Sequence, residues 1–324
     1  MPRKYSNRIS ERDVEQAYAA YQGLAPGQRK IVTLILIAAA IFALVAFLRQ
    51  KFPAGGGAVA DSDEMLLGNP SGATPDPLNT DNYLMVKPYF AVGYDAALGE
   101  PRWVSWEVTP VDLGDAPRKQ IFDPDQTLPM NFTRVTTHDY SDSGFDRGHM
   151  CPHGDRTANL DMSYATFIMT NVIPQAPNVN RKAWAQLEEY CRELAKNDGD
   201  HLYIMDGPAG EGGRGSMGFR DTVGHGRVVV PAYCWKVAVV VPPSSDGNDL
   251  AHITPASRVI AVWMPNDQEK VGEEWDSFRT TPAVIEAKTG LHFFSKLAPA
   301  VASGLDHELD KTYIPPPEPM KFDD

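Results

Sequence analysis

The sequence predicts an α+β fold, an antiparallel sheet with flanking helices, preceded by one transmembrane helix. Short β-type segments follow one another without the regular alternation with helices that a parallel sheet requires. One later segment, residues 181–196, carries apolar residues at helical spacing. Near the N-terminus, residues 31–48 form an uninterrupted apolar run. These three observations separate an N-terminal membrane region from a globular body.

The composition is that of a chain with a packed core. Hydrophobic residues make up 43% of the 324 residues and charged residues 22%, which excludes global disorder. The net charge of −12 argues against a protein that coats nucleic acid through general positive charge, but it permits an enzyme with a local basic cleft. Cys151, Cys191 and Cys234 form no CxxC pair, so we expect buried thiols or at most one disulfide.

The apolar run at residues 31–48 has the length of a membrane span. As a helix it extends about 27 Å, close to the bilayer core of about 30 Å. More basic residues precede the run than follow it, which predicts a cytoplasmic segment at residues 1–30 and an extracytoplasmic or periplasmic body. Two alternatives stay open: a signal peptide cleaved after Ala58-Val59-Ala60, and a buried core helix. Residues 49–80 are rich in Gly, Pro and Ser and read as a flexible linker.

The globular domain is expected at residues 81–300, followed by a Pro-rich tail at 301–324. A short second helix is expected to end near Gly290. The glycine run at residues 207–215 formally contains GxGxxG, but no helix follows it, so a dinucleotide site is rejected. Strands are expected at residues 83–94, 102–110, 131–140, 166–173, 201–206, 226–241 and 258–264.

Three closely spaced blocks carry the polar residues that suggest chemistry. They are Phe145-Asp146-Arg147-Gly148-His149, then Thr170-Asn171-Val172-Ile173-Pro174-Gln175, then Asn178-Val179-Asn180-Arg181-Lys182-Ala183-Trp184. At about 100° per residue, Asn180 lies at the centre of the apolar stripe of the predicted helix and at its start. Glu188 lies at the edge of that stripe. We therefore expect Asn180 to face a neighbouring strand pair.

These residue types suit phosphodiester hydrolysis. The reaction needs a base that takes a proton from water, and histidine serves because its ordinary pKa lies near 6.5. It also needs charge neutralisation on the phosphoryl and leaving oxygens, which a hard divalent cation with oxygen ligands supplies. His149 follows Gly148, which allows close approach of substrate, and the amide oxygen of Asn180 is an adequate ligand for Mg²⁺.

In this order and spacing the three blocks resemble the DNA/RNA non-specific endonuclease family, the ββα-metal nucleases that include endonuclease G. The resemblance covers roughly residues 83–298. It implies a ββα-metal domain in which a helix packs against a β-hairpin with one Mg²⁺ between them, Mn²⁺ or another divalent cation being alternatives. It further implies DNA and RNA as substrates, and a homodimer is a further expectation.

The resemblance also implies roles for individual residues. His149 would be the general base and Asn180 the direct metal ligand. Arg147, Glu188 and Arg118 complete the expected catalytic set. Three further residues would support the metal shell or the substrate: Asp146, Asn171 and Arg192.

Two other functions use the same residues. His149, Cys151 and His153 alternate, so on a strand they would face one side and could bind zinc with Cys191 or Cys234. The second alternative is a non-catalytic, membrane-tethered module that binds nucleic acid. Against it, the base, the ligand and the residues of the water shell are all present, and no aromatic and basic stacking platform stands out.

Overall fold

The structure is a computed structural model that describes residues 63–272 and 274–314, together with residues 21–25, 27, 28, 30 and 33. The chain divides into two compact units, Met1–Gly57 and Ala58–Asp324. Apart from Thr33, the predicted membrane span at residues 31–48 lies outside the described residues, as do residues 49–62 of the predicted linker. The rest of that segment, residues 63–80, is described, and Met65, Leu67 and Ala73 in it are buried. No helix among the described residues is both long and apolar enough to cross a membrane.

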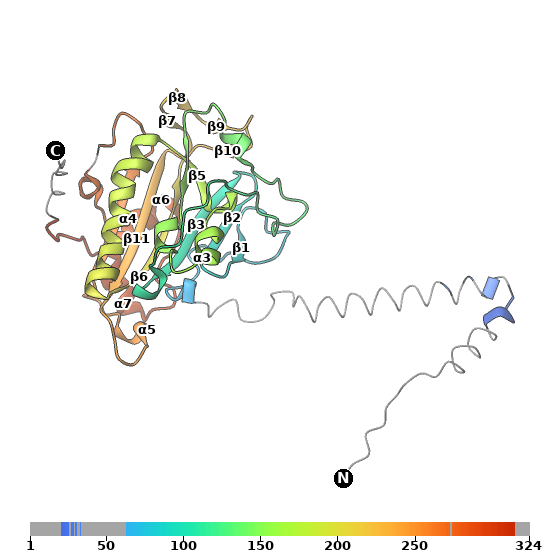
Figure 1. Cartoon of the computed structure of the whole chain (residues 1–324). Coiled ribbons are helices and arrows are strands. Elements are labelled where there is room, and N and C mark those ends of the chain that lie inside the picture. The colour runs from blue at the N-terminus through green and yellow to red at the C-terminus, as the bar shows by residue number, and fades with distance from the viewer. Residues whose placement is uncertain are drawn as a thin grey trace, which may run out of the picture. The chain divides into compact units, whose positions relative to one another are not determined.

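The second unit is built on a six-stranded antiparallel sheet with the strand order β1-β2-β3-β6-β11-β12 (Figure 1). This confirms the predicted antiparallel α+β architecture. The strands are β1 (Tyr83–Val86), β2 (Ala91–Asp95), β3 (Glu100–Val108), β6 (His201–Ala209), β11 (Tyr233–Val241) and β12 (Val259–Pro265).

The sheet has a hydrophobic core on each face because its central strands alternate buried side chains between the two sides. On one side Trp106 of β3 packs with Trp184 and Leu187 of α4 (Trp184–Glu193). On the other side Trp235 packs with residues of α5, α6 and α7 and of the segments around them. These helices are α5 (Asp249–His252), α6 (Pro282–Thr289) and α7 (Pro299–Asp306). The sheet therefore separates two layers of helices.

A separate hairpin lies on the α4 side of the sheet. Strand β4 (Asp146–His149) pairs antiparallel with β5 (Val172–Gln175), and His149 stands opposite Val172. The connection between them contains the short helix α3 (Leu160–Ala165), which Asn159 caps by accepting a hydrogen bond from the Met162 amide. After β5, a π-helical turn at Val179–Ala183 leads into α4. The predicted order of hairpin and helix is present.

Several predicted boundaries were wrong for local reasons. The strand expected at residues 131–140 is a loop ending in a 3₁₀ turn at Thr137–Tyr140. There the Asp139 carboxylate accepts hydrogen bonds from the amide and the hydroxyl of Thr136, a cap that starts a helical turn. The segment at residues 226–241 splits at Pro231 into β10 (Val228–Val229) and β11.

The remaining elements are small. β9 (Thr222–Val223) pairs with β10. The glycine run continues into a hairpin of β7 (Gly213–Gly215) and β8 (Gly218–Arg220), which agrees with the rejection of a dinucleotide site. Helix α7 extends past residue 300, the predicted end of the domain, and Leu305 is fully buried in the second core.

Candidate active site

The end of β4 is fixed by close packing and by one buried amide. A side chain at Gly148 would place its Cβ 2.3 Å from Oε1 of Gln175 on the paired strand, so only glycine fits there. Asn171 is fully buried, and its Oδ1 accepts from the Cys151 amide at 2.9 Å. Its Nδ2 donates to the carbonyls of Cys151 (2.8 Å) and Thr166 (2.9 Å). Asn171 thus supports the site by holding the backbone just after His149.

His149 lies in a cage of two aromatic rings. Its ring centroid is 4.8 Å from that of Phe122 and 4.8 Å from that of Phe167, and only 8% of the residue is exposed. Burial, with smaller contributions from Arg118 and His153, lowers the pKa of His149 to about 3. The imidazole is therefore neutral at pH 7. Its Nε2 is buried without a hydrogen-bond partner in the described part of the chain, so no side chain there competes for this atom.

Two exposed arginines flank this cage. The Arg118 guanidinium lies 5.1 Å from the centre of the Phe167 ring, and that of Arg147 lies 5.5 Å from the centre of the Phe122 ring. Both distances are in the range of cation–π contacts. The two positive charges therefore lie at the surface, one beside each ring that packs on His149.

Asn180 and Asp146 are in direct contact. Asn180, in the π-helical turn before α4, donates from Nδ2 to Oδ2 of Asp146 at 2.9 Å. Arg181 binds the same carboxylate through two hydrogen bonds of 2.7 Å each. The hydrogen bond to Asp146 uses the Nδ2 of Asn180. Its Oδ1 has no donor among the described residues. A neutral amide oxygen oriented in this way, next to a carboxylate, fits a hard cation such as Mg²⁺.

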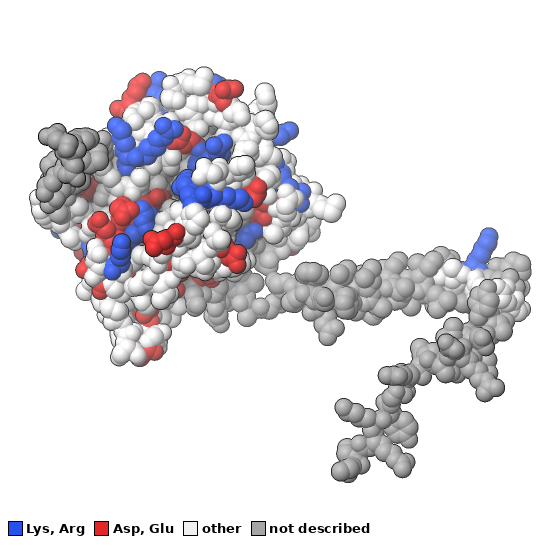
Figure 2. Space-filling model, viewed as in Figure 1, with Lys and Arg blue, Asp and Glu red and all other residues white. Residues whose placement is uncertain are grey.

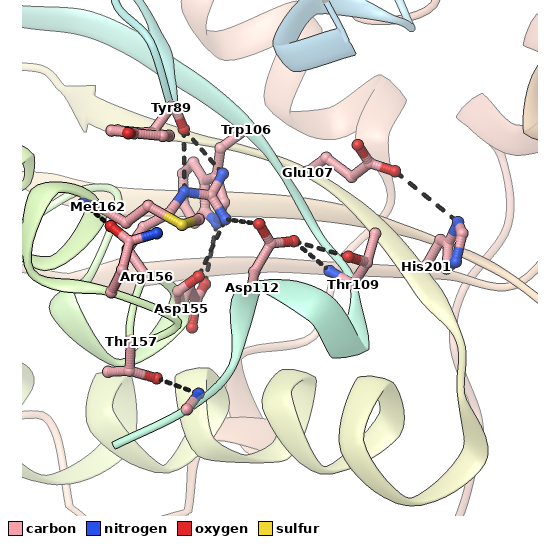
Figure 3. A network of polar contacts seen from close by, with 12 residues as sticks. Tyr89, Trp106, Glu107, Thr109, Asp112, Asp155, Arg156, Thr157, Met162 and His201 are labelled. Atoms are coloured by element: carbon pink, nitrogen blue, oxygen red, sulfur yellow. Dashed lines mark hydrogen bonds and ion pairs between the residues drawn. The ribbon is translucent and has the colours of Figure 1, made fainter. Parts of the chain in front are cut away.

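Glu188 and Arg192 lie on α4, about two and three helical turns after Asn180. Arg192 donates to Asp155 at 3.0 Å. Asp155 also accepts from the Trp106 indole at 2.9 Å, and both of these residues are labelled in Figure 3. Burial raises the pKa of the partly exposed Glu188 to about 8, although the charges of Lys236 and Arg192 oppose the shift. Glu188 is therefore mostly protonated at neutral pH in the protein without a cation.

Most of the predicted residues are thus connected through direct contacts and electrostatic interactions. Arg118 and His153 lower the pKa of His149, Arg192 acts on His153 in the same direction, and Glu188 raises the pKa of Arg192. Sequence reasoning missed the Phe122 and Phe167 cage, the two hydrogen bonds of Arg181, and a role for His153 beside His149. For Arg181 a signal existed, since it directly follows Asn180 in the third block.

A polar cavity of about 670 Å³ adjoins the start of the hairpin. Most residues of the segments 136–143 and 220–227 line it, and the first of these segments ends three residues before β4. Arg220 and Arg227 line it, and the Arg220 Nε donates to the Ser143 carbonyl at 3.2 Å. Asp142 and His225, the two non-glycine residues of the described chain with positive φ (51° and 58°), both line it. Strained backbone of this kind is held in place by its surroundings and often marks a functional site.

Basic side chains collect on the face that carries this hairpin. In Figure 2, which has the view of Figure 1, Lys and Arg side chains gather between the upper end of α4 and α3, while acidic side chains lie mainly below them. The net charge of the chain is −12, so this positive area is local. It is the local positive area that an acidic protein needs to approach a polyanion.

The zinc alternative is not supported. Strand β4 ends at His149, so His149, Cys151 and His153 do not lie on one strand face. All three cysteines are free and buried, which confirms the expectation of buried thiols. Within the described residues, the one group of at least three His, Cys, Asp or Glu side chains with metal-binding spacing is Glu107, His201 and Asp249, which shares no residue with the predicted site.

Comparison with known proteins decides the family. The model of the DNA/RNA non-specific endonuclease family matches residues 67–300. The chain belongs to this family. A curated nuclease from Nostoc sp. strain PCC 7120 is 43% identical over 249 residues, which cover 77% of this chain and 86% of that protein. The human mitochondrial nuclease EXOG is 30% identical over 215 residues, which cover 64% of this chain and 55% of that protein.

The fold of this family member is also similar to a solved structure. A chain of the crystal structure of the EndoG/EndoGI complex, described as showing the mechanism of EndoG inhibition, aligns with a TM-score of 0.57 and 26% identity. The alignment covers 72% of this chain and 91% of that one. The family and the nuclease relatives confirm that the chain is a hydrolase with nuclease activity, and they count against the non-catalytic alternative.

Proposed function

We propose that this nuclease is a metal-dependent, sugar-non-specific endonuclease that hydrolyses phosphodiester bonds of DNA and RNA, with His149 as its general base. One observation carries the assignment of the base: a neutral, caged imidazole whose Nε2 has no partner in the described chain, between two exposed arginines. A base must be unprotonated and must have a free lone pair, and His149 meets both conditions.

In this mechanism His149 removes a proton from the attacking water. The Phe122 and Phe167 rings keep its orientation fixed, so little reorganisation is needed when the proton moves. Arg118 contributes positive charge close to His149, because it is one of the charges that lower the pKa of that residue. It is placed to attract the phosphoryl oxygens. Arg147 provides a second positive charge on the other ring of the cage.

We assign the cation to Asn180, with Asp146, Glu188 and Arg192 in support. Mg²⁺ bound there would neutralise charge on the phosphoryl and leaving oxygens while keeping most of its ligands as water. Asp146 fixes the Asn180 amide, and Arg181 in turn fixes Asp146. Glu188 supplies a carboxyl group whose proton can leave when positive charge arrives nearby.

The direct test uses the full-length chain with supercoiled plasmid DNA and with RNA. We expect both substrates to be cut in Mg²⁺, both activities to stop with EDTA, and both to return with excess Mg²⁺. Conversion of supercoiled to open-circular plasmid before short fragments appear would show internal cleavage. Cleavage of only one of the two nucleic acids, or cleavage that persists in EDTA, would contradict the proposal.

We also propose that the nuclease domain is anchored to a membrane by residues 31–48, with the N-terminus in the cytoplasm and the domain in the extracytoplasmic or periplasmic space. The proposal rests on the 18-residue apolar run and on the excess of basic residues before it. Protease added to intact spheroplasts should remove the domain. A domain that resists protease until lysis would contradict this topology.

We further propose that the chain forms a homodimer. Light scattering of the detergent-solubilised chain should then give about twice the chain mass of 35.6 kDa, after subtraction of the detergent. A mass equal to that of one chain across the concentration range of the assay would refute it.

A further inference from the structure

A second cluster of metal-ligand side chains lies across the sheet from the proposed active site. Glu107 stands near the end of β3, His201 begins β6, and Asp249 begins α5. Trp106 belongs to the core on the α4 side, so Glu107, the next residue on the strand, faces the opposite side. Tyr203, the register partner of Glu107, belongs to the second core and confirms this direction. The cluster is therefore separate from His149 and Asn180.

The side chains of this cluster converge. The potential ligand atoms of Glu107, His201 and Asp249 all lie within 4.8 Å of one another. His201 Nδ1 is 2.5 Å from Oδ2 of Asp249 and 3.8 Å from Oε1 of Glu107, the contact drawn in Figure 3. The Tyr203 hydroxyl lies 2.9 Å from the same Glu107 oxygen and 2.7 Å from the same Asp249 oxygen.

One carboxylate oxygen of the cluster is buried without a partner. The His201 Nδ1 atom and the Tyr203 hydroxyl both contact Oδ2 of Asp249, not its Oδ1. Asp249 is only 6% exposed, yet its Oδ1 is buried without a hydrogen-bond partner in the described chain. A buried, unpaired carboxylate oxygen is costly, and such groups are normally satisfied by a donor or an ion. This oxygen is an observation independent of the ligand spacing.

We propose that Glu107, His201 and Asp249 form a binding site for a transition-metal dication, with Zn²⁺ as the expected ion. One imidazole nitrogen and two carboxylates match the ligands of zinc, whereas Mg²⁺ and Ca²⁺ prefer oxygen ligands alone. Two ligand atoms of a tetrahedral zinc site lie about 3.3 Å apart when each bond is about 2.0 Å. The observed separations of 2.5 and 3.8 Å from His201 Nδ1 lie on either side of this value, and all three ligand atoms lie within 4.8 Å of one another, so the side chains would have to shift to reach tetrahedral spacing.

The solvent exposure of the side chains indicates how the fourth ligand position would be filled. The Glu107 and His201 side chains are 24% and 29% exposed, so the site opens to solvent on one side and leaves a fourth position for water. Tyr203 would orient both carboxylates from behind, as second-layer hydrogen bonds commonly do in zinc sites. The ion would link β3, β6 and the segment between β11 and β12 that contains α5. We therefore expect it to stabilise the folded protein.

The experiment measures zinc binding by the full-length chain after EDTA treatment and removal of the EDTA. Calorimetric titration with Zn²⁺ is run in millimolar Mg²⁺, so that a site that prefers oxygen ligands is already filled. We expect one Zn²⁺ per chain and a rise in Tm on adding Zn²⁺. His201→Ala and Asp249→Asn should each weaken binding at least about tenfold and remove the rise in Tm.

His252→Ala is the matched control, because His252 lies on the same helix, is exposed and pairs with Asp246 outside the cluster. This variant should bind zinc as the unchanged chain does. Should Asp249→Asn fail to fold, Glu107→Gln, at a more exposed position, answers the same question. Absence of saturable binding by the unchanged chain, unchanged binding in the His201 variant, or loss of binding in the His252 variant would overturn the proposal. None of these readouts depends on nuclease activity.

Discussion

Replacing His149 with alanine should remove catalysis while leaving the fold intact. General-base catalysis contributes about 10²–10⁴-fold, which corresponds to about 2.7–5.5 kcal/mol of the activation barrier. The effect on stability is expected to be smaller because two terms oppose each other. Loss of the two ring contacts with Phe122 and Phe167 costs about 0.5–1.5 kcal/mol each. Removal of the buried, unpaired Nε2 restores about 1–3 kcal/mol.

The stability terms therefore nearly cancel, and Tm should move by a few degrees at most. His153→Ala is the matched control. His153 contacts the same Phe167 ring at 5.8 Å, and its Nε2 is also buried without a partner in the described chain. The assay is initial-rate cleavage of plasmid DNA at saturating Mg²⁺, with circular dichroism as the folding control. Near-normal turnover after His149→Ala, combined with loss of activity after His153→Ala, would transfer the role of base to His153 and refute the reasoning.

Three further predictions concern the shell of the site, its pH dependence and the cavity. Glu188→Ala should lower activity about 10–100-fold, and raising the Mg²⁺ concentration should partly restore it, because we place Glu188 outside the direct ligands; no restoration at high Mg²⁺ would contradict this. Since the pKa of Glu188 is raised to about 8, cation binding should displace its proton, so the apparent Mg²⁺ Kd should fall as pH rises from 6 to 8; a pH-independent Kd by calorimetry would disprove it. We expect Arg220 and Arg227 to contact phosphate groups, so alanine at either position should raise KM for DNA and leave kcat unchanged. It should also reduce the slope of log binding constant against log salt concentration by about 0.9 per lost contact. An unchanged slope would show that the cavity does not bind substrate.

The helix of the site could be predicted because its apolar spacing is local, whereas the hairpin was expected from the resemblance of three short blocks to the nuclease family. The blocks containing His149, Asn171 and Asn180 lie within about forty residues. The inward position of Asn180 also followed from helical periodicity, and the structure places its side chain on Asp146 of the hairpin. The π-helical turn at Val179–Ala183 could not be read from the sequence, because it continues into α4 with the same apolar stripe.

What sequence reasoning missed depends on contacts between distant segments or on local caps. Phe122 and Phe167 reach His149 from two separate loops, and nothing in their neighbours indicates that they meet on one imidazole. The strand expected near residues 131–140 failed because the cap formed by Thr136 and Asp139 outweighed the β-type composition. The cluster of Glu107, His201 and Asp249 comes from three elements that only the sheet brings together.

The measurement that tests the central claim most directly is turnover against Mg²⁺ concentration for Asn180→Ala. Asn178→Ala is the control, since its amide donates to the Gln268 carbonyl at 2.8 Å, away from Asp146. With circular dichroism showing folded protein, Asn180→Ala should lose more activity than Glu188→Ala, and excess Mg²⁺ should restore little of it. Asn178→Ala should keep the Mg²⁺ dependence of the unchanged chain. An Asn180→Ala protein with unchanged turnover and Mg²⁺ dependence would show that the cation is held elsewhere and would contradict the proposed mechanism.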